Sequence, residues 1–359
     1  MKKINILLTG LALTALLCPL AAQQIRLAGG DTAKPAARAA SGAEDHEQDY
    51  AQLGTPALGY YVRGKHVRLM LGVPGAAHLS EVLPGLKDTA RAIAAPGHDW
   101  VLTLSKQTAQ AWRPETGEAW PLPGVDGLPS ATALSPSGRE AAFYFEQDGR
   151  LLVYGGLPSH PELLHSAAHL LWPRGISELA LAPGAGTLAG LAPDGLYLLS
   201  PDPESTPVAI HAATGLRSLS FGASDAQIAF LDSEAGALMV ASRQNDSYFV
   251  QPAAGAGQGL SNPEYAAFDA AGLLWVASRE AAALWRVDPA TGTVERFDSP
   301  APGRVERLRL RGALLVSSPE EPATQIALLH DGLAGLSWVP APTVPAELAA
   351  AEPAQEVRQ

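Results

Sequence analysis

The chain has 359 residues, of which 47% are hydrophobic, 17% charged and 6% aromatic. This apolar content supports a buried core and excludes a disordered chain, and the glycines show no three-residue period, which excludes collagen. The 25 lysines and arginines against 36 acidic residues give a net charge of −11, so we expect no nucleic-acid partner and no attraction to an anionic membrane surface.

The first 22 residues have the composition of a secretory signal peptide. Lys2 and Lys3 precede the apolar run Ile4–Leu17, and Leu20–Ala22 is suited to a cleavage site. The run is shorter than the roughly 20 residues that cross a bilayer as a helix. A lipoprotein anchored at Cys18 is the alternative, but the leucine before it is too large for that motif. We therefore expect a protein exported to the periplasm or the extracellular space, with no transmembrane segment in the mature chain.

Composition divides the rest of the chain into three parts. Residues 23–48 and 341–359 are rich in alanine and charge, with little to bury, so we expect a flexible leader and a disordered tail. Between them, residues 49–340 consist of short apolar runs separated by turns, a pattern that recurs about every 40 residues. This middle part is predicted to be one repeat domain.

The repeat is aligned on the first tight turn of each copy. These turns lie 39 to 47 residues apart, at Pro96, Pro136, Pro183, Gly222, Asp269 and Arg311. A step of 40 residues back from Pro96 reaches Pro56, which follows the apolar run Tyr50–Leu53 and makes a seventh unit.

Each unit supplies four runs of strand length and none of helix length. The predicted fold is therefore all-β: a single β-propeller, with seven four-stranded blades, after a cleaved signal peptide. A β-sandwich and a β-solenoid are the alternatives. No C-terminal strand is evident that would complete the first unit and close the ring.

Three segments carry a family likeness. Leu284–Phe297 (LWRVDPATGTVERF) resembles the blade signature of NHL and YVTN-type propellers, in which an Asp-Pro-x-Thr-Gly turn joins the third and fourth strands, and Trp112–Trp120 (WRPETGEAW) is a weaker copy. Leu134–Tyr154 (LSPSGREAAFYFEQDGRLLVY) is similar to the blades of WD40-like and TolB-type propellers. The resemblance implies the fold over residues 49–340. It says little about activity, because some relatives are metal-dependent lactonases or lyases and others bind proteins.

The predicted site follows from the alignment of the repeats. The positions five residues before the aligned turns are Ala51, Arg91, Ala131, Glu178, Arg217, Glu264 and Glu306. In a propeller these positions surround one mouth of the central channel. We therefore predict that Arg91, Glu178, Arg217, Glu264 and Glu306 form a charged mouth that binds a protein or a small polar ligand. The alternative is that strand starts carry charge only because they are solvated.

No catalytic residue is assigned, because the sequence contains neither a Gly-x-Ser-x-Gly nor a His-Glu-x-x-His motif. The four-residue spacing of His165 and His169 suits a metal pair on a helical turn, or an ordinary insertion. We expect no cofactor, with a divalent cation at an acidic channel rim as the alternative.

The sequence thus favours an exported binding or scaffold protein. Two other functions stay open. One is a metal-dependent hydrolase or lyase, similar to a lactonase, that uses the same mouth. The other is an outer-layer assembly component that uses its blade rims. The oligomeric state is left undetermined.

Overall fold

The computed structural model describes residues 57–63, 65–73, 76–85, 88–97, 99–245, 247–269, 271–278 and 283–298, and the backbone of residues 307–311, 314–318, 325–329 and 336–340. The predicted signal peptide, leader and tail lie outside the described residues, as does Glu306. All described residues belong to one compact unit, Ala51–Gln359. Within them, no helix is long and apolar enough to cross a membrane.

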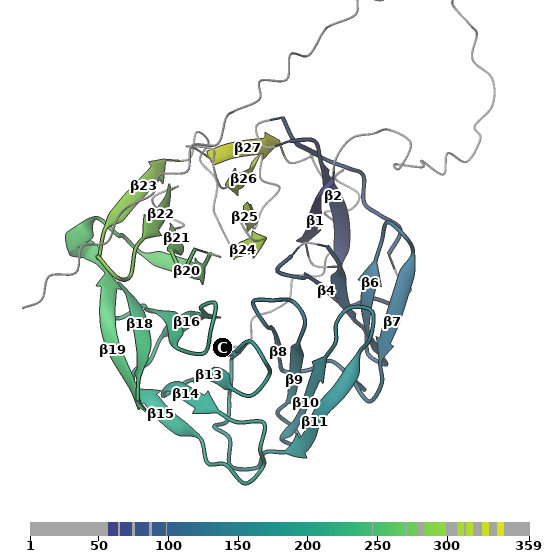
Figure 1. Ribbon diagram of the computed structural model, residues 1–359, viewed down its shortest axis with the longest axis horizontal. Helices are drawn as coiled ribbons and strands as arrows, with labels where there is room; N and C mark the ends of the chain where they lie inside the picture. The colour runs from purple at the N-terminus through teal and green to yellow at the C-terminus, as the bar shows by residue number, and fades with distance from the viewer. Residues whose placement is uncertain are drawn as a thin grey trace, which may run out of the picture. The chain divides into compact units, whose positions relative to one another are not determined.

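The described residues form antiparallel sheets that follow one another in chain order around a central axis (Figure 1). One sheet has three strands, β1 (Ala57–Arg63), β2 (His66–Leu71) and β3 (His78–Leu79). A single-turn 3₁₀ helix, η2, spans Ala256–Gln258. Six four-stranded sheets follow in chain order. The first two are β4 (Arg91–Ala94), β5 (Val101–Leu104), β6 (Ala109–Arg113) and β7 (Glu118–Leu122), and then β8 (Ala131–Leu134), β9 (Ala141–Phe145), β10 (Arg150–Gly155) and β11 (Glu162–Ala168). The third and fourth are β12 (Glu178–Leu181), β13 (Leu188–Ala192), β14 (Gly195–Leu199) and β15 (Val208–His211), and then β16 (Leu216–Phe221), β17 (Gln227–Asp232), β18 (Ala237–Gln244) and β19 (Ser247–Ala254). The last two are β20 (Pro263–Phe268), β21 (Leu274–Ser278), β22 (Ala283–Val287) and β23 (Val294–Asp298), and then β24 (Arg307–Arg311), β25 (Leu314–Ser318), β26 (Gln325–Leu329) and β27 (Leu336–Pro340).

The first strand of each four-stranded sheet lies innermost. β12 lies against β8 and β16, and β20 lies against β16 and β24, so the inner strands of neighbouring sheets touch around the axis. This is the arrangement of a β-propeller, in which each sheet is a blade. The predicted all-β propeller with four-stranded blades is confirmed.

The predicted number of blades is wrong: the described residues form six four-stranded blades, not seven. The first unit differs, because it contributes only β1, β2 and β3, and its expected first run, Tyr50–Leu53, lies outside the described residues. Its outer strand, β3, is two residues long and lies between proline-glycine pairs at 74–75 and 84–85. Beyond β3, the N–H groups of Ser80 and Leu83 still donate to the carbonyl oxygens of Leu69 and Val67, without forming a regular strand. The recurrence of apolar runs does not show how many of them pair.

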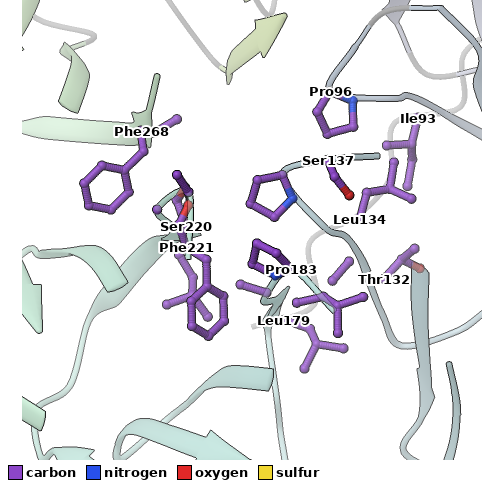
Figure 2. A pocket seen from close by; sticks show the side chains of 18 of the residues that line it. Ile93, Pro96, Thr132, Leu134, Ser137, Leu179, Pro183, Ser220, Phe221 and Phe268 are labelled. Carbon is purple, nitrogen blue, oxygen red and sulfur yellow. Dashed lines mark hydrogen bonds between the residues drawn. The ribbon is translucent and has the colours of Figure 1, made fainter. Parts of the chain in front are cut away.

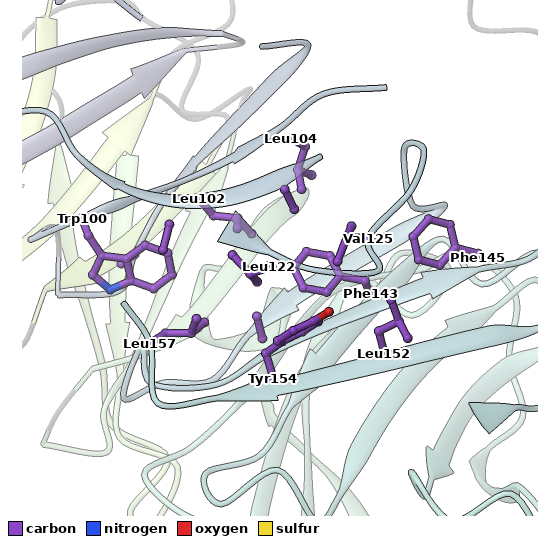
Figure 3. Close-up of a cluster of buried hydrophobic side chains, with 14 residues drawn as sticks. Trp100, Leu102, Leu104, Leu122, Val125, Phe143, Phe145, Leu152, Tyr154 and Leu157 are labelled. Atoms are coloured by element: carbon purple, nitrogen blue, oxygen red, sulfur yellow. The ribbon is translucent and has the colours of Figure 1, made fainter. Parts of the chain in front are cut away.

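Blades pack because both faces of each central strand are apolar. Along β9, Ala141, Phe143 and Phe145 point into the core shared with the preceding blade, whereas Ala142 and Tyr144 point into the core shared with the following one. Successive side chains of a strand face opposite sides of the sheet, so an unbroken apolar run fills two cores. Figure 3 shows the first of these cores, between the β4–β7 and β8–β11 blades.

The Asp-Pro-x-Thr-Gly segment forms the turn that the resemblance implied. It joins β22 to β23, with the side chain of Asp288 accepting hydrogen bonds from the Ala290 N–H at 2.8 Å and from the Thr291 hydroxyl at 2.9 Å. These bonds favour the carboxylate and lower the pKa of Asp288. Gly292 has a φ of +69°, which few other residues adopt without strain. The motif is thus structural.

The segment around His165 and His169 is not a helical turn. His165 lies in the outer strand β11 and is exposed, whereas His169 follows the strand, is 3% exposed and stacks on Trp172 with ring centroids 4.6 Å apart. An extended chain rises about 3.3 Å per residue, so two positions four residues apart lie much farther apart than they would on a helix. The helical turn that a metal pair would need is not formed, which leaves the alternative of an ordinary insertion.

We expect His169 to make the folded protein less stable in acid. Burial lowers the pKa of His169, against opposing effects of Asp202 and the Pro201 carbonyl. Below the usual imidazole pKa of about 6.5, the unfolded chain therefore binds a proton that the folded chain does not. The free energy of unfolding should fall as the pH drops from about 6.5 toward the lowered pKa. Urea unfolding at several pH values would show a smaller fall for His169→Phe; an equal fall would contradict this.

Candidate functional site

The aligned turns of the repeats meet at one end of the central channel, here called the turn end. A cavity of about 550 Å³ opens there (Figure 2). Its lining includes five of the turn positions used to align the repeats: Pro96, Pro136, Pro183, Gly222 and Asp269. The register of these five units is confirmed, because equivalent positions gather around one axis.

The wall of the turn-end cavity is mainly apolar. Beyond the prolines, it is formed by side chains from the inner strands of four successive blades, among them Ile93, Leu134, Leu179 and Phe221. Phe268, from the inner strand of a fifth blade, lies on the side of Phe221 and across from Ile93 and Leu134 (Figure 2). Small residues such as Ala133 and Ala180 lie on the same strands, and they leave room in the middle of the ring. The space is suited to an apolar group.

Few polar groups of the cavity wall are free to bind a ligand. Asp269, the one charged residue among the lining side chains that the structure describes, accepts hydrogen bonds from the Ala271 and Leu273 N–H groups and from Trp275 Nε1, each at 2.9 Å. By contrast, the Oγ1 atom of Thr132 is buried and has no hydrogen-bond partner. A buried hydroxyl without a hydrogen-bond partner costs free energy. A ligand group that forms a hydrogen bond with Thr132 would remove this cost and so bind more tightly.

The predicted charged mouth lies at the opposite end of the inner strands, here called the strand-start end. Arg91 and Glu178 are the first residues of β4 and β12, and Arg217 and Glu264 are the second residues of β16 and β20. None of them lines the turn-end cavity. The expected placement at strand starts is confirmed for these four residues, and Glu306 lies outside the described residues.

Glu178 binds the backbone of the neighbouring blade. One oxygen of its carboxylate accepts the N–H of Ser218 and the other accepts the N–H of Leu219, both at 2.9 Å. Ser218 has a φ of +59° and lies where the pairing of β16 with β17 shifts register. Such an irregularity leaves backbone N–H groups without an acceptor in the sheet, and the two oxygens of the Glu178 carboxylate act as the acceptors instead.

The same serine continues the connection to a third blade. The Oγ atom of Ser218 accepts a hydrogen bond from the N–H of Ala266 at 2.6 Å and donates one to its carbonyl oxygen at 3.0 Å. Glu178, Ser218 and Ala266 thus join β12, β16 and β20. Side chains at the strand-start end therefore hold blades together.

The other predicted residues of this end differ in exposure. Arg217 is exposed, and its Nε donates a hydrogen bond to the Ser233 hydroxyl at 2.5 Å. Arg91 is also exposed, whereas Glu264 is half-buried. In the described part of the chain, no group of three histidine, cysteine or acidic side chains is arranged to hold a metal ion. A binding role for these charged residues stays a prediction.

Sequence reasoning missed the turn-end cavity because the turn positions were used only to count repeats. The signal was available: three of the turns begin with proline, and apolar residues such as Ile93, Leu134 and Leu181 precede them. The cavity is lined by consecutive residues of an inner strand, such as Leu179, Ala180 and Leu181, so alternation along the strand does not identify the side chains that reach the channel. Alternation also does not show whether the channel is filled or open, because that depends on how the blades pack around the axis.

Solved structures share this fold. The β-propeller domain of Cps50 (Swd1) from Myceliophteria thermophila matches with a TM-score of 0.52 and 11% sequence identity, over 80% of this chain and 90% of that chain. The Pan2 WD40 domain of Neurospora crassa matches at 0.48 and 12%, over 76% and 88%, and a chain of a nidogen/laminin complex at 0.44 and 13%, over 71% and 97%. No family model and no curated protein matches the chain. The predicted likeness to β-propellers is confirmed at the level of the fold.

Proposed function

We propose that this protein is a binding module that holds a partner protein at the turn end of its channel. The cavity of about 550 Å³, lined by apolar side chains from the inner strands, carries this proposal. Its volume is within the range of pockets that bind compact ligands. Among the described lining residues, the one charged side chain, Asp269, is engaged by its own turn.

An apolar side chain on a loop or terminus of the partner is the ligand that suits this wall. Each buried Å² of apolar surface contributes about 25 cal/mol, so a leucine or phenylalanine anchor gains affinity from contacts with Leu179 and Phe221. A backbone group next to the anchor can pair with Thr132 Oγ1. Insertion of one anchor fits the room that the alanines leave in the middle of the ring.

Photo-crosslinking in the producing cell tests this proposal. Ala223 is exposed and lines the cavity, so benzoylphenylalanine placed there should crosslink to a partner protein. Leu134→Glu puts a charge into the apolar wall and should abolish that crosslink, because a buried unpaired charge is costly. The matched control is the photoreactive group at Glu295, an exposed position on an outer strand, which should give no such crosslink.

The charged strand-start end is a second candidate for binding. The exposed side chains of Arg91 and Arg217 at the starts of two inner strands favour it, because cations at a channel mouth attract an acidic ligand. Benzoylphenylalanine at Arg91 distinguishes the two ends. Crosslinks from Arg91 alone would support the strand-start end against the cavity. Crosslinks from neither position would contradict both.

We also propose that the chain is exported and processed, on the basis of its first 22 residues. The Lys2-Lys3 start and the apolar run that follows support this. Intact-mass measurement of protein recovered from outside the cytoplasm should give a chain that begins at Gln23. Unprocessed chain retained in the cytoplasm would contradict export, and lipid attached to Cys18 would instead support the lipoprotein alternative.

A further inference from the structure

A groove outside the channel lies at the junction of two blades that are neighbours in the ring, β8–β11 and β12–β15 (Figure 1). Its volume is about 500 Å³. Its lining comes from the loop between β11 and β12, from the turn between β13 and β14 and from β14 itself, and includes Leu171, Pro173, Arg174, Pro193, Asp194 and Tyr197. The described lining thus holds one cation and one anion beside apolar side chains.

The cation and the anion lie on two loops that touch each other. Gly175 follows Arg174, and a Cβ atom at Gly175 would lie 3.1 Å from the Cγ atom of Pro193, the residue before Asp194. Even so, Arg174 forms no hydrogen bond or ion pair with Asp194 or with any other residue that the structure describes. An arginine that lies near an acid without bonding to it leaves both charges open to a third group.

The loop that carries Arg174 is fixed on both sides of this residue. Trp172 and Ile176 are buried, and the carboxylate of Glu146 accepts a hydrogen bond from the Gly175 N–H at 2.5 Å. Because the backbone is already held, a ligand that binds the guanidinium does not have to order the loop first, which would cost conformational entropy.

The turn that carries Asp194 is fixed as well. A Cβ atom at Gly195 would overlap the carbonyl oxygen of His211, so glycine allows the turn to pack against β15. One carboxylate oxygen of Asp194 accepts a hydrogen bond from the Tyr197 hydroxyl at 2.8 Å. This hydrogen bond raises the pKa of Tyr197, so the hydroxyl keeps its proton and continues to donate. The carboxylate is thereby oriented, and its second oxygen is available to a donor on a ligand.

We propose that this groove binds a zwitterion of the amino-acid type, either a free amino acid or a short peptide, with an apolar side chain. The ligand carboxylate pairs with Arg174, whose guanidinium suits a carboxylate bidentately, and the ligand ammonium donates to Asp194. The apolar side chain of the ligand covers Leu171, which is 68% exposed, and contacts Pro193. This site is independent of the channel and of the partner protein proposed there.

Saturation-transfer difference NMR of the full chain, titrated with leucine and with leucyl-leucine, tests this site. The two charges of leucine are on one carbon atom, whereas in the dipeptide they are one residue, about 3.5 Å, farther apart, so the tighter ligand identifies the source. Its analogues with the carboxylate amidated or the ammonium acetylated should bind at least about tenfold more weakly, because each leaves one charge of the groove without its partner.

Two variants assign the charges of the ligand to residues. Arg174→Gln should bind the zwitterion no more tightly than the wild type binds the amidated analogue. Asp194→Asn should bind it no more tightly than the wild type binds the acetylated analogue. Arg139→Gln is the matched control, because Arg139 is exposed and does not line the groove, and it should bind the zwitterion as the wild type does.

Four results would overturn the proposal. The first is that neither ligand shows saturable binding up to about 20 mM, a range that includes millimolar affinity. The second is that the blocked analogues bind as tightly as the zwitterion. The third is that Arg174→Gln and Asp194→Asn, both folded by circular dichroism, bind it as the wild type does. The fourth is binding that only Leu134→Glu abolishes, because the ligand would then occupy the turn-end cavity.

Discussion

Replacing Trp275 with alanine is expected to lower the free energy of unfolding by about 3–5 kcal/mol. Trp275 lies on β21, is 1% exposed, and stacks on Phe297 with ring centroids 5.4 Å apart. Its Nε1 donates a hydrogen bond to Asp269 Oδ2 at 2.9 Å. The substitution therefore creates a large cavity and removes one hydrogen bond that holds the turn at the channel.

Urea unfolding monitored by circular dichroism measures this loss. Trp275→Phe should lose less, because it keeps most of the apolar volume and gives up only the indole hydrogen bond. Ala223→Ser, at an exposed turn residue, should lie within about 0.5 kcal/mol of the wild type. A loss below about 1 kcal/mol for Trp275→Ala would show that the side chain is not held in the core.

Glu178→Gln is expected to lower the free energy of unfolding by about 1.5–3 kcal/mol, the worth of a hydrogen bond to a charged group. Each carboxylate oxygen of Glu178 accepts one backbone N–H from β16, at 2.9 Å. An amide has one oxygen and one nitrogen, so one of the two N–H groups would face an N–H donor instead of an acceptor. The connection between the β12 and β16 blades would weaken.

The control for this prediction is Glu295→Gln, which removes an exposed ion pair with Arg286. Exposed ion pairs contribute little, so this variant should lose less than about 1 kcal/mol. A Glu178→Gln variant as stable as the wild type would mean that its carboxylate is dispensable for the fold. That result would favour a ligand-binding role at the strand-start end.

Much of the fold was predictable because it depends on neighbours in the sequence. Turns such as Asp288–Gly292 form through bonds within five residues, so their chemistry can be recognised in one unit alone. The unbroken apolar run of β9 predicts a strand buried on both faces. The number of blades was not predictable, because a run of suitable residues in the first unit does not ensure that each strand finds a partner.

At the two ends of the channel, too, some features follow from the sequence and others only from the tertiary structure. The period of the sequence by itself determined which residues begin and end the inner strands, so Arg91, Glu178 and Pro183 were placed at the correct ends. Only the tertiary structure decided that Glu178 is bonded to Ser218, 40 residues away, and that the turn end holds an open apolar cavity. The strand pattern follows from local geometry, whereas contacts between blades and the space inside their ring depend on how whole sheets pack.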